Sequence, residues 1–173
     1  MKHGLLITFF LLSIFKCVYA QETDPKKTKF GLKLGTIVSY GRDGQDLNDS
    51  NLFGGFFVER TISDEFDIQA ELLYTRAYGV SIIELPILLK YNFSKKIGAY
   101  FGGEFNYIPN DRNAVTFIEK PFGIGANFGV QYNINKNWFL DARYSYGYSN
   151  QIRVFNYLTG SKQSYSLNVG YKF

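Results

Sequence analysis

Histidine and cysteine are nearly absent from this sequence of 173 residues, which contains one of each, His3 and Cys17. A Ser-His-Asp or Cys-His catalytic site needs a histidine, and a thiolate metal site or a disulfide needs cysteines. Both residues lie near the N-terminus, in a segment that we expect to be removed. The sequence therefore predicts a mature protein that is not an enzyme, with no catalytic residues, no metal site and no cofactor.

Other features are missing as well. No apolar run reaches about 20 residues, the length that a helix needs to cross a bilayer. The 17 glycines form no Gly-X-Y repeat and the 4 prolines form no tract, which excludes collagen-like and low-complexity classes. Because 46% of the residues are apolar, the chain is not intrinsically disordered. Its length suits a single domain.

The first twenty residues have the pattern of a secretory signal peptide. Lys2 supplies a positive charge, Leu5 to Phe15 form an apolar run, and Val18-Tyr19-Ala20 places small residues where a signal peptidase reads them. We expect cleavage after Ala20, so that residues 1–20 form the signal peptide. Without Lys2 and Lys16, 17 basic residues face 15 acidic ones. This small excess predicts no nucleic-acid partner.

Beyond this segment, residues 21–29 are polar and have no period, which indicates a flexible periplasmic leader. From residue 30 to the end, apolar and polar residues alternate, as they do in β-strands, whose successive side chains point to opposite faces. Eight segments show this alternation, and they are Phe30 to Tyr40, Leu52 to Arg60, Phe66 to Thr75, Ile83 to Phe93, Ile97 to Tyr107, Phe122 to Tyr132, Trp138 to Tyr148 and Gln163 to Phe173. The segment from Leu52 is ambiguous, because its phenylalanines occupy both faces.

The lengths of these segments and of their connections indicate a membrane barrel. A tilted strand needs about 9 to 11 residues to cross a bilayer, whereas ordinary strands have about 5 to 6. If the eight segments are counted in chain order, the connections after the second, fourth and sixth segments are short and polar. Three of the four connections after the odd-numbered segments are long, namely Gly41 to Asn51, Ile108 to Pro121 and Ser149 to Lys162. Short periplasmic turns and longer outside loops are typical of outer-membrane barrels. Residues 30–173 are therefore predicted to form an all-β, eight-stranded antiparallel up-and-down transmembrane β-barrel.

The apolar faces carry aromatic residues near both strand ends. Leu, Ile, Val and Ala lie between them, as expected for a wall that meets two lipid–water interfaces. The aromatic residues are Tyr40, Tyr74, Tyr107, Tyr146 and Tyr148 on the loop side, and Phe66, Tyr91, Phe93, Tyr132, Trp138, Tyr171 and Phe173 on the turn side. This distribution favours a lipid-facing apolar wall over a soluble barrel that binds a lipophilic ligand, which remains an alternative.

The opposite face is expected to line the lumen, where charges alternate with glycine and asparagine. Eight strands enclose only enough space for side chains, so we expect these charges to pair in a structural network. A conducting path and a catalytic carboxylate pair remain the alternatives. The predicted lumen residues are Lys33, Glu59, Asp67, Glu71, Glu84, Lys90, Glu104, Asp141, Arg143 and Lys172.

Four segments carry a resemblance to one family, and two of them, Ala142 to Gly147 and Val169 to Phe173, lie near the end of the sequence. Glu71-Leu72-Leu73-Tyr74 and the run from Ile83 to Tyr91, IELPILLKY, resemble the E-L-x-Y and L-E-I-P-L-L-L-K-Y motifs of PorT-like, porin-family outer-membrane β-barrel domains. The architecture also resembles OmpX and the OmpA membrane domain. The resemblance implies a barrel in the outer membrane of a Gram-negative bacterium, surrounded by its lipid, and implies no substrate. The leading hypothesis is a non-enzymatic barrel that acts through its outside loops or as a structural component, and the alternative is a small-solute channel.

The last strand ends in an unbroken outward stripe. Its members are Tyr165, Leu167, Val169, Tyr171 and Phe173. The resemblance to outer-membrane proteins implies that a terminal phenylalanine on such a stripe is read by the barrel-assembly machinery during biogenesis. The simpler alternative is that Phe173 is one more ring of the aromatic girdle.

Overall fold

The computed structural model describes residues 28–40, 49–77, 80–109, 116–118, 120–149, 151–154, 157–158 and 163–173. The predicted signal peptide, residues 21–27 of the predicted leader and most of the first outside loop lie outside this part of the chain. Among the described residues, no helix is long and apolar enough to cross a membrane.

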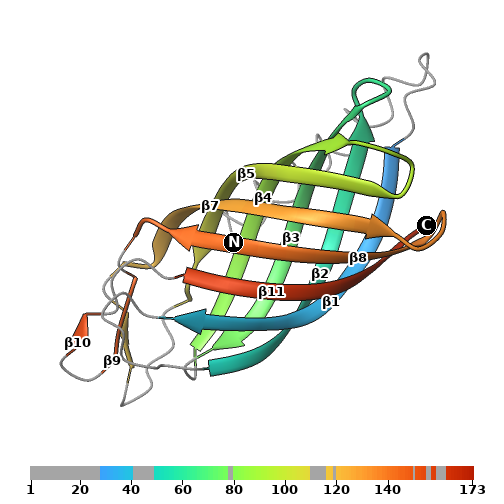
Figure 1. Ribbon diagram of the computed structural model, residues 1–173. Helices are drawn as coiled ribbons and strands as arrows, with labels where there is room; N and C mark the ends of the chain where they lie inside the picture. Colours follow the sequence, from blue (N-terminus) through green and yellow to red (C-terminus); the bar gives the residue numbers. More distant parts are fainter. Residues whose placement is uncertain are drawn as a thin grey trace, which may run out of the picture.

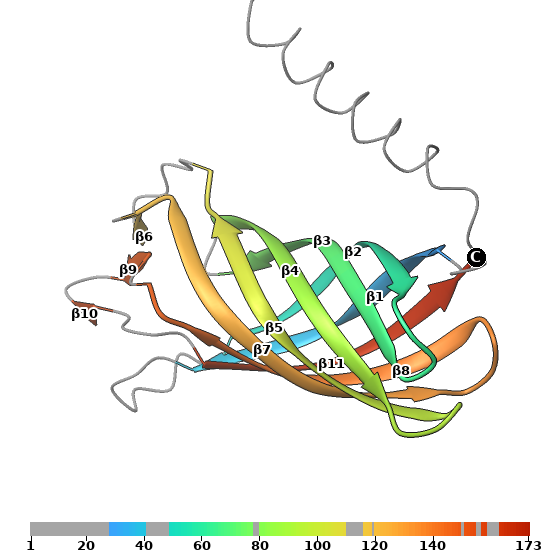
Figure 2. The same cartoon turned by 90° about the horizontal axis from the view of Figure 1, so that it is seen from above.

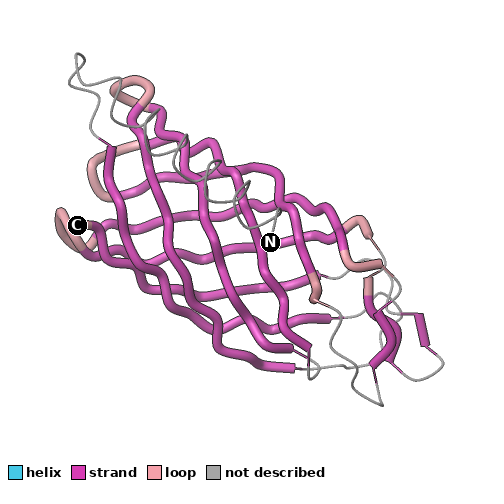
Figure 3. The backbone as a smooth tube through the Cα atoms, turned by 180° about the vertical axis from the view of Figure 1, so that it is seen from behind, coloured by secondary structure: helices cyan, strands magenta, loops and turns pink. Residues whose placement is uncertain are grey.

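Eight long strands form one closed antiparallel barrel (Figures 1 and 3). They are β1 (Thr28–Tyr40), β2 (Asp49–Thr61), β3 (Phe66–Ala77), β4 (Val80–Asn92), β5 (Ile97–Tyr107), β7 (Phe122–Asn133), β8 (Trp138–Gly147) and β11 (Gln163–Lys172). Neighbours in the barrel follow the order β1-β11-β8-β7-β5-β4-β3-β2, and β1 pairs with β11 to close it. The predicted fold class is confirmed. Strand β1 begins at Thr28, two residues before the predicted start at Phe30.

Three short strands within the predicted loops form a second sheet. Strand β6 (Thr116–Ile118) pairs with β9 (Ile152–Val154), which pairs with β10 (Tyr157–Leu158). The sheet lies at the end of the barrel opposite the C-terminus (Figure 2). Strands of two or three residues are too short to show an alternating pattern, and β6 and β9 belong to different loops. The sequence pattern therefore did not predict this sheet.

The alternation in sequence becomes an inner and an outer surface. Outward side chains in the middle of the strands are apolar and exposed, for example Leu34, Leu72 and Leu167. In β2, Phe53 and Phe57 point inward and are buried, whereas Phe56 points outward and is exposed. This resolves the ambiguity of that strand. An apolar outer wall of this extent suits a lipid environment and excludes a water-soluble barrel.

Pro86 lies inside β4, where a residue without an N–H group would interrupt a strand ladder. The pairing of β3 with β4 is continuous as far as Ala70–Ile87 and resumes at Leu73–Glu84. The gap between these pairs contains Pro86. The missing hydrogen-bond donor therefore coincides with an interruption in the ladder.

Candidate functional site: the charged barrel interior

The structure places all ten predicted lumen residues on the inner surface of the barrel. All of them are buried, with at most 7% of each residue exposed to solvent. They comprise six acids and four bases, and Lys29, half-buried at the end of β1, adds a fifth base near this set. A buried charge is costly unless it is paired. Two groups of ion pairs account for most of these charges.

The first group is centred on Glu71 of β3. Its Oε1 atom accepts hydrogen bonds from Lys33 Nζ at 2.6 Å, from Arg143 Nη2 at 2.8 Å and from Gln69 Nε2 at 2.6 Å. Lys33 also pairs with Asp141, at 3.4 Å. In the order of strands around the barrel, β3 and β8 are four strands apart in either direction. The Arg143–Glu71 pair therefore connects opposite walls across the axis of the barrel.

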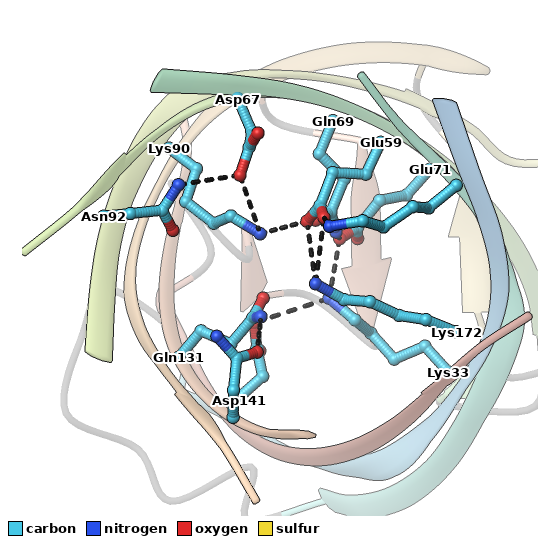
Figure 4. Close-up of polar contacts among 12 residues, drawn as sticks. Lys33, Glu59, Asp67, Gln69, Glu71, Lys90, Asn92, Gln131, Asp141 and Lys172 are labelled. Atoms are coloured by element: carbon cyan, nitrogen blue, oxygen red, sulfur yellow. Dashed lines mark hydrogen bonds and ion pairs between the residues drawn. The ribbon is translucent and has the colours of Figure 1, made fainter. Parts of the chain in front are cut away.

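The second group lies nearer the short turns and is centred on Glu59 of β2. The Glu59 carboxylate pairs with Lys90, with Lys172 at 2.9 Å and with Lys29 at 3.5 Å. Lys90 also lies 3.7 Å from Asp67, whose carboxylate accepts a hydrogen bond from Asn92 at 2.7 Å. Figure 4 shows side chains from different strands converging in the interior. Each carboxylate thus has several donors, as a buried anion requires.

Above the Glu71 group, toward the loops, the interior becomes less charged. Glu104 accepts a hydrogen bond from Asn127 at 2.8 Å, and Ser145 donates to the amide oxygen of Asn127 at 2.5 Å. A cluster of buried apolar side chains also fills this half, and it consists of Ile37, Phe53 and Leu73. Glu84 is buried at 7% exposure.

Three inward aromatic side chains lie over glycines of the neighbouring strand. The cross-strand pairs are Phe57–Gly31, Tyr100–Gly129 and Phe139–Gly170. A Cβ atom added at any of these glycines would lie about 2 Å from the aromatic ring. The glycines therefore leave the volume that the rings occupy. Alternation in sequence put Tyr100 and Phe139 on the polar faces and left the face of Phe57 open, and only the strand register could match each ring to its glycine.

The aromatic rings also contact the charged groups. Phe139 lies between the two ion-pair groups, with Lys172 Nζ at 5.2 Å and Lys33 Nζ at 5.7 Å from its ring centre. Phe57 packs edge-on against the same ring, with 5.5 Å between the centres. Arg143 donates a hydrogen bond to the Tyr100 hydroxyl at 3.1 Å. The attraction between a cation and the face of an aromatic ring further stabilises these buried charges.

At the turn end, the interior opens into a polar cavity of about 410 Å³. Glu59, Lys90 and Lys172 close its inner side, and Lys29, Lys95 and Asp64 lie around it. Among the described residues, no three acidic, histidine or cysteine side chains gather as a metal ion would require. The chemistry of the interior is therefore that of fixed, mutually paired charges.

The outer surface carries the aromatic residues that the sequence predicted to form two girdles. On the turn side, Trp138 and Tyr171 pack edge-on at 4.9 Å, and Tyr171 packs on Phe173 at 5.4 Å. On the loop side, the rings of Tyr107 and Phe122 lie 5.0 Å apart. The Tyr40 side chain lies outside the described part of the structure. The two levels of rings mark two interfaces on either side of an aliphatic band.

A closed eight-stranded barrel with a charged interior, an aliphatic outer band and two aromatic levels defines an integral outer-membrane barrel protein. The family model for the outer membrane protein beta-barrel domain matches residues 8–173, and the chain belongs to this family. The protein is thus located in the outer membrane of a Gram-negative bacterium. A search of curated protein sequences finds no match for this chain.

Solved structures of the same architecture match most of the chain. Ail, the attachment invasion locus protein of Yersinia pestis, is 12% identical with a TM-score of 0.55, and the match covers 86% of this chain and 99% of Ail. Neisserial surface protein A is 16% identical with a TM-score of 0.54, covering 84% and 97%. The N-terminal barrel domain of Pseudomonas aeruginosa OprF is 12% identical with a TM-score of 0.53, covering 85% and 100%. At these identities the likeness concerns the fold alone.

Proposed function

We propose that this protein is a closed, non-enzymatic outer-membrane barrel that acts through its outside loops and does not conduct solutes through its lumen. The observation that carries the proposal is the Arg143–Glu71 ion pair, which joins opposite walls of the barrel at 2.8 Å. Lys33 and Tyr100 hold the two partners from the sides. The apolar cluster around Leu73 lies above this pair and further occupies the lumen.

Conductance across a planar bilayer tests this proposal. We expect the purified wild-type protein to give no stable, sizeable single-channel steps. The double variant Glu71→Ser/Arg143→Ser removes the bridge between the walls and is expected to conduct more than wild type. Glu65→Ser, a change in an exposed turn, serves as the control and should leave conductance unchanged. Sizeable steps from the wild-type protein would favour the small-solute channel instead.

The outside loops offer a built surface for contacts. Strand β6 belongs to the loop after β5, and β9 and β10 belong to the loop after β8, so the small sheet joins two loops that are distant in sequence. Ordered structure projecting from a rigid barrel is a common arrangement for binding surfaces. This supports a contact role for the loop end.

Within the family, we propose that the protein is one of the PorT-like barrels. The motif residues that carry this resemblance are distributed over both surfaces of the barrel. Glu71, Glu84 and Lys90 point inward, whereas Tyr74 and Tyr91 point outward. The motif thus combines lumen charges with girdle aromatics, which gives it a structural role and assigns no ligand.

We also propose that the C-terminal stripe is read by the barrel-assembly machinery. Tyr165, Leu167 and Phe173 are exposed on the outer wall, and Phe173 is the most exposed of them at 72%. The backbone N–H of Phe173 donates to the Phe30 carbonyl at 2.9 Å, which holds the chain end at the β1–β11 closure. The Phe173 ring contacts Tyr171 of the same strand, with 5.4 Å between the ring centres, and most of its surface stays available for recognition.

Truncation of the terminal ring separates recognition from packing. Phe173→Ala should reduce assembly into the outer membrane of cells strongly, while refolding of the purified protein into detergent stays close to wild type. Phe93→Ala is the matched control, because Phe93 is 64% exposed and also packs edge-on against a tyrosine. The control should affect both assays to the same small degree. Equal losses for Phe173→Ala in the two assays would leave it only a packing role.

A further inference from the structure

The outer wall of the barrel is not evenly covered by large side chains. A groove of about 790 Å³ crosses it over five neighbouring strands, β1, β11, β8, β7 and β5. Its floor follows one row of outward residues. Each residue of the row is the register partner of the residue before it, on the neighbouring strand. The row consists of Thr36, Leu167, Ala142, Val130 and Ala99. Three of the five, Thr36, Ala142 and Ala99, are small, which explains the depression.

Large side chains border the groove on its loop side. They are Val38, Tyr165, Tyr144 and Phe128, which form the next outward row of register partners. An open groove with an apolar floor and an apolar rim fits an extended hydrocarbon chain. Filling it restores the dispersion contacts that the small residues leave unmade.

The turns below this part of the wall are positively charged. Lys95 and Lys96 precede β5, Lys136 follows β7, and all three are exposed. The backbone N–H of Asn133 donates to the Lys96 carbonyl at 2.7 Å, and the Asn133 side chain donates to the Lys95 carbonyl at 3.2 Å. The two turns are thus held side by side. Ala99 in the groove lies three residues after Lys96, which is about 10 Å along a strand.

The three lysines lie on the turns β4–β5 and β7–β8, and strands β5, β7 and β8 carry the groove. The acidic turn between β2 and β3, with Asp64 and Glu65, is next to the β4–β5 turn, and its two strands lie outside the groove. The positive charge of this end thus follows the strands that carry the groove. This arrangement matches an amphiphile with an aliphatic chain and an anionic head.

We propose that the groove and the lysines Lys95, Lys96 and Lys136 form a binding site for an anionic phospholipid of the periplasmic leaflet. One acyl chain lies in the groove over Ala142 and Ala99, and the phosphate lies near the lysines. A second copy of the barrel fits less well. A two-fold contact centred on the groove would place groove against groove and leave both unfilled.

Spin-labelled lipids test the site in phosphatidylcholine vesicles that contain the folded protein. The readout is the number of motionally restricted lipids per barrel, measured by electron paramagnetic resonance with labelled phosphatidylglycerol or labelled phosphatidylcholine. Wild type should restrict more phosphatidylglycerol than phosphatidylcholine. Ala142→Phe should lower the number restricted for both lipids, because the ring fills the floor. Folding of each variant is verified by its heat-modifiable mobility on gels.

The lysine variants test the contact with the lipid headgroup separately from the contact with the acyl chain. Each of Lys95→Gln, Lys96→Gln and Lys136→Gln should reduce the preference for phosphatidylglycerol by up to about fivefold, and raised salt should have the same effect. The controls are Ala70→Phe, at an outward alanine of β3 outside the groove, and Lys120→Gln, at an exposed lysine near the loops. Neither should change the result.

Three results would overturn the site. The first is equal restriction of the two lipids by wild type. The second is an effect of Ala70→Phe as large as that of Ala142→Phe. The third is a wild-type dimer in mild detergent that Ala142→Phe converts to monomer, which would assign the groove to a second copy of this chain.

Discussion

Replacing Glu71 with alanine should destabilise the folded barrel by about 3 to 5 kcal/mol, the usual cost of removing one partner from a buried ion pair. Glu71 is buried at 3% exposure and accepts hydrogen bonds from Lys33, Arg143 and Gln69. Lys33 retains Asp141 as a partner, whereas Arg143 loses its ion-pair partner at 2.8 Å and keeps a hydrogen bond to the neutral Tyr100 hydroxyl. The free energy of unfolding in lipid vesicles, measured by urea titration, gives the loss directly.

A double-mutant cycle distinguishes the ion pair from the volume of the two side chains. Arg143→Met alone should be strongly destabilising, because it leaves Glu71 with less positive charge around it. The double variant Glu71→Met/Arg143→Met removes both charges and should recover a large part of the loss, since apolar replacements of a buried pair are often neutral. Glu65→Ala in the exposed turn should change stability by less than about 0.5 kcal/mol. Additive single losses would mean that Arg143 and Glu71 do not interact energetically.

The faces of the strands could be predicted from sequence, because successive side chains of a strand point to opposite faces and so give the sequence a period of two residues. Alternation assigned Leu140 outward and Asp141 inward without knowledge of any neighbour. The pairing between charges could not be predicted in this way. Whether Arg143 meets Glu71 or another acid depends on the tilt and stagger of all eight strands, which set the residues that share one level of the lumen.

The same limit applies to the outer wall. Ala142, Ala99 and Thr36 are ordinary outward residues when each strand is read alone, and they form a groove only because the register places them in one row. The inward rings of Phe57 and Phe139 could have been paired with glycines only with the same information. The alternation in sequence thus determines the two surfaces of this barrel, and the strand register determines which residues meet on each surface.

Arginine placed on the outer wall should destabilise the barrel according to its depth in the membrane. Leu72 lies near the middle of β3 and is 49% exposed on the outer wall. Leu72→Arg therefore puts a charge in the hydrocarbon region, which costs about 2 to 4 kcal/mol near the midplane. Leu140 is the third residue of β8, two positions from the girdle residue Trp138. Leu140→Arg should cost less, because its side chain can reach the interface on the turn side.

The control for this series is Ile134→Arg, in the exposed turn between β7 and β8. Its cost should be close to zero, because the side chain is already in the aqueous or interfacial region. Urea unfolding in vesicles, with folding verified on gels, gives the three free energies on one scale. The order Leu72→Arg, Leu140→Arg, Ile134→Arg from largest to smallest loss follows from a bilayer centred on the middle of the strands. A loss for Ile134→Arg as large as that for Leu72→Arg would place the hydrocarbon region over the turns and contradict this position of the membrane.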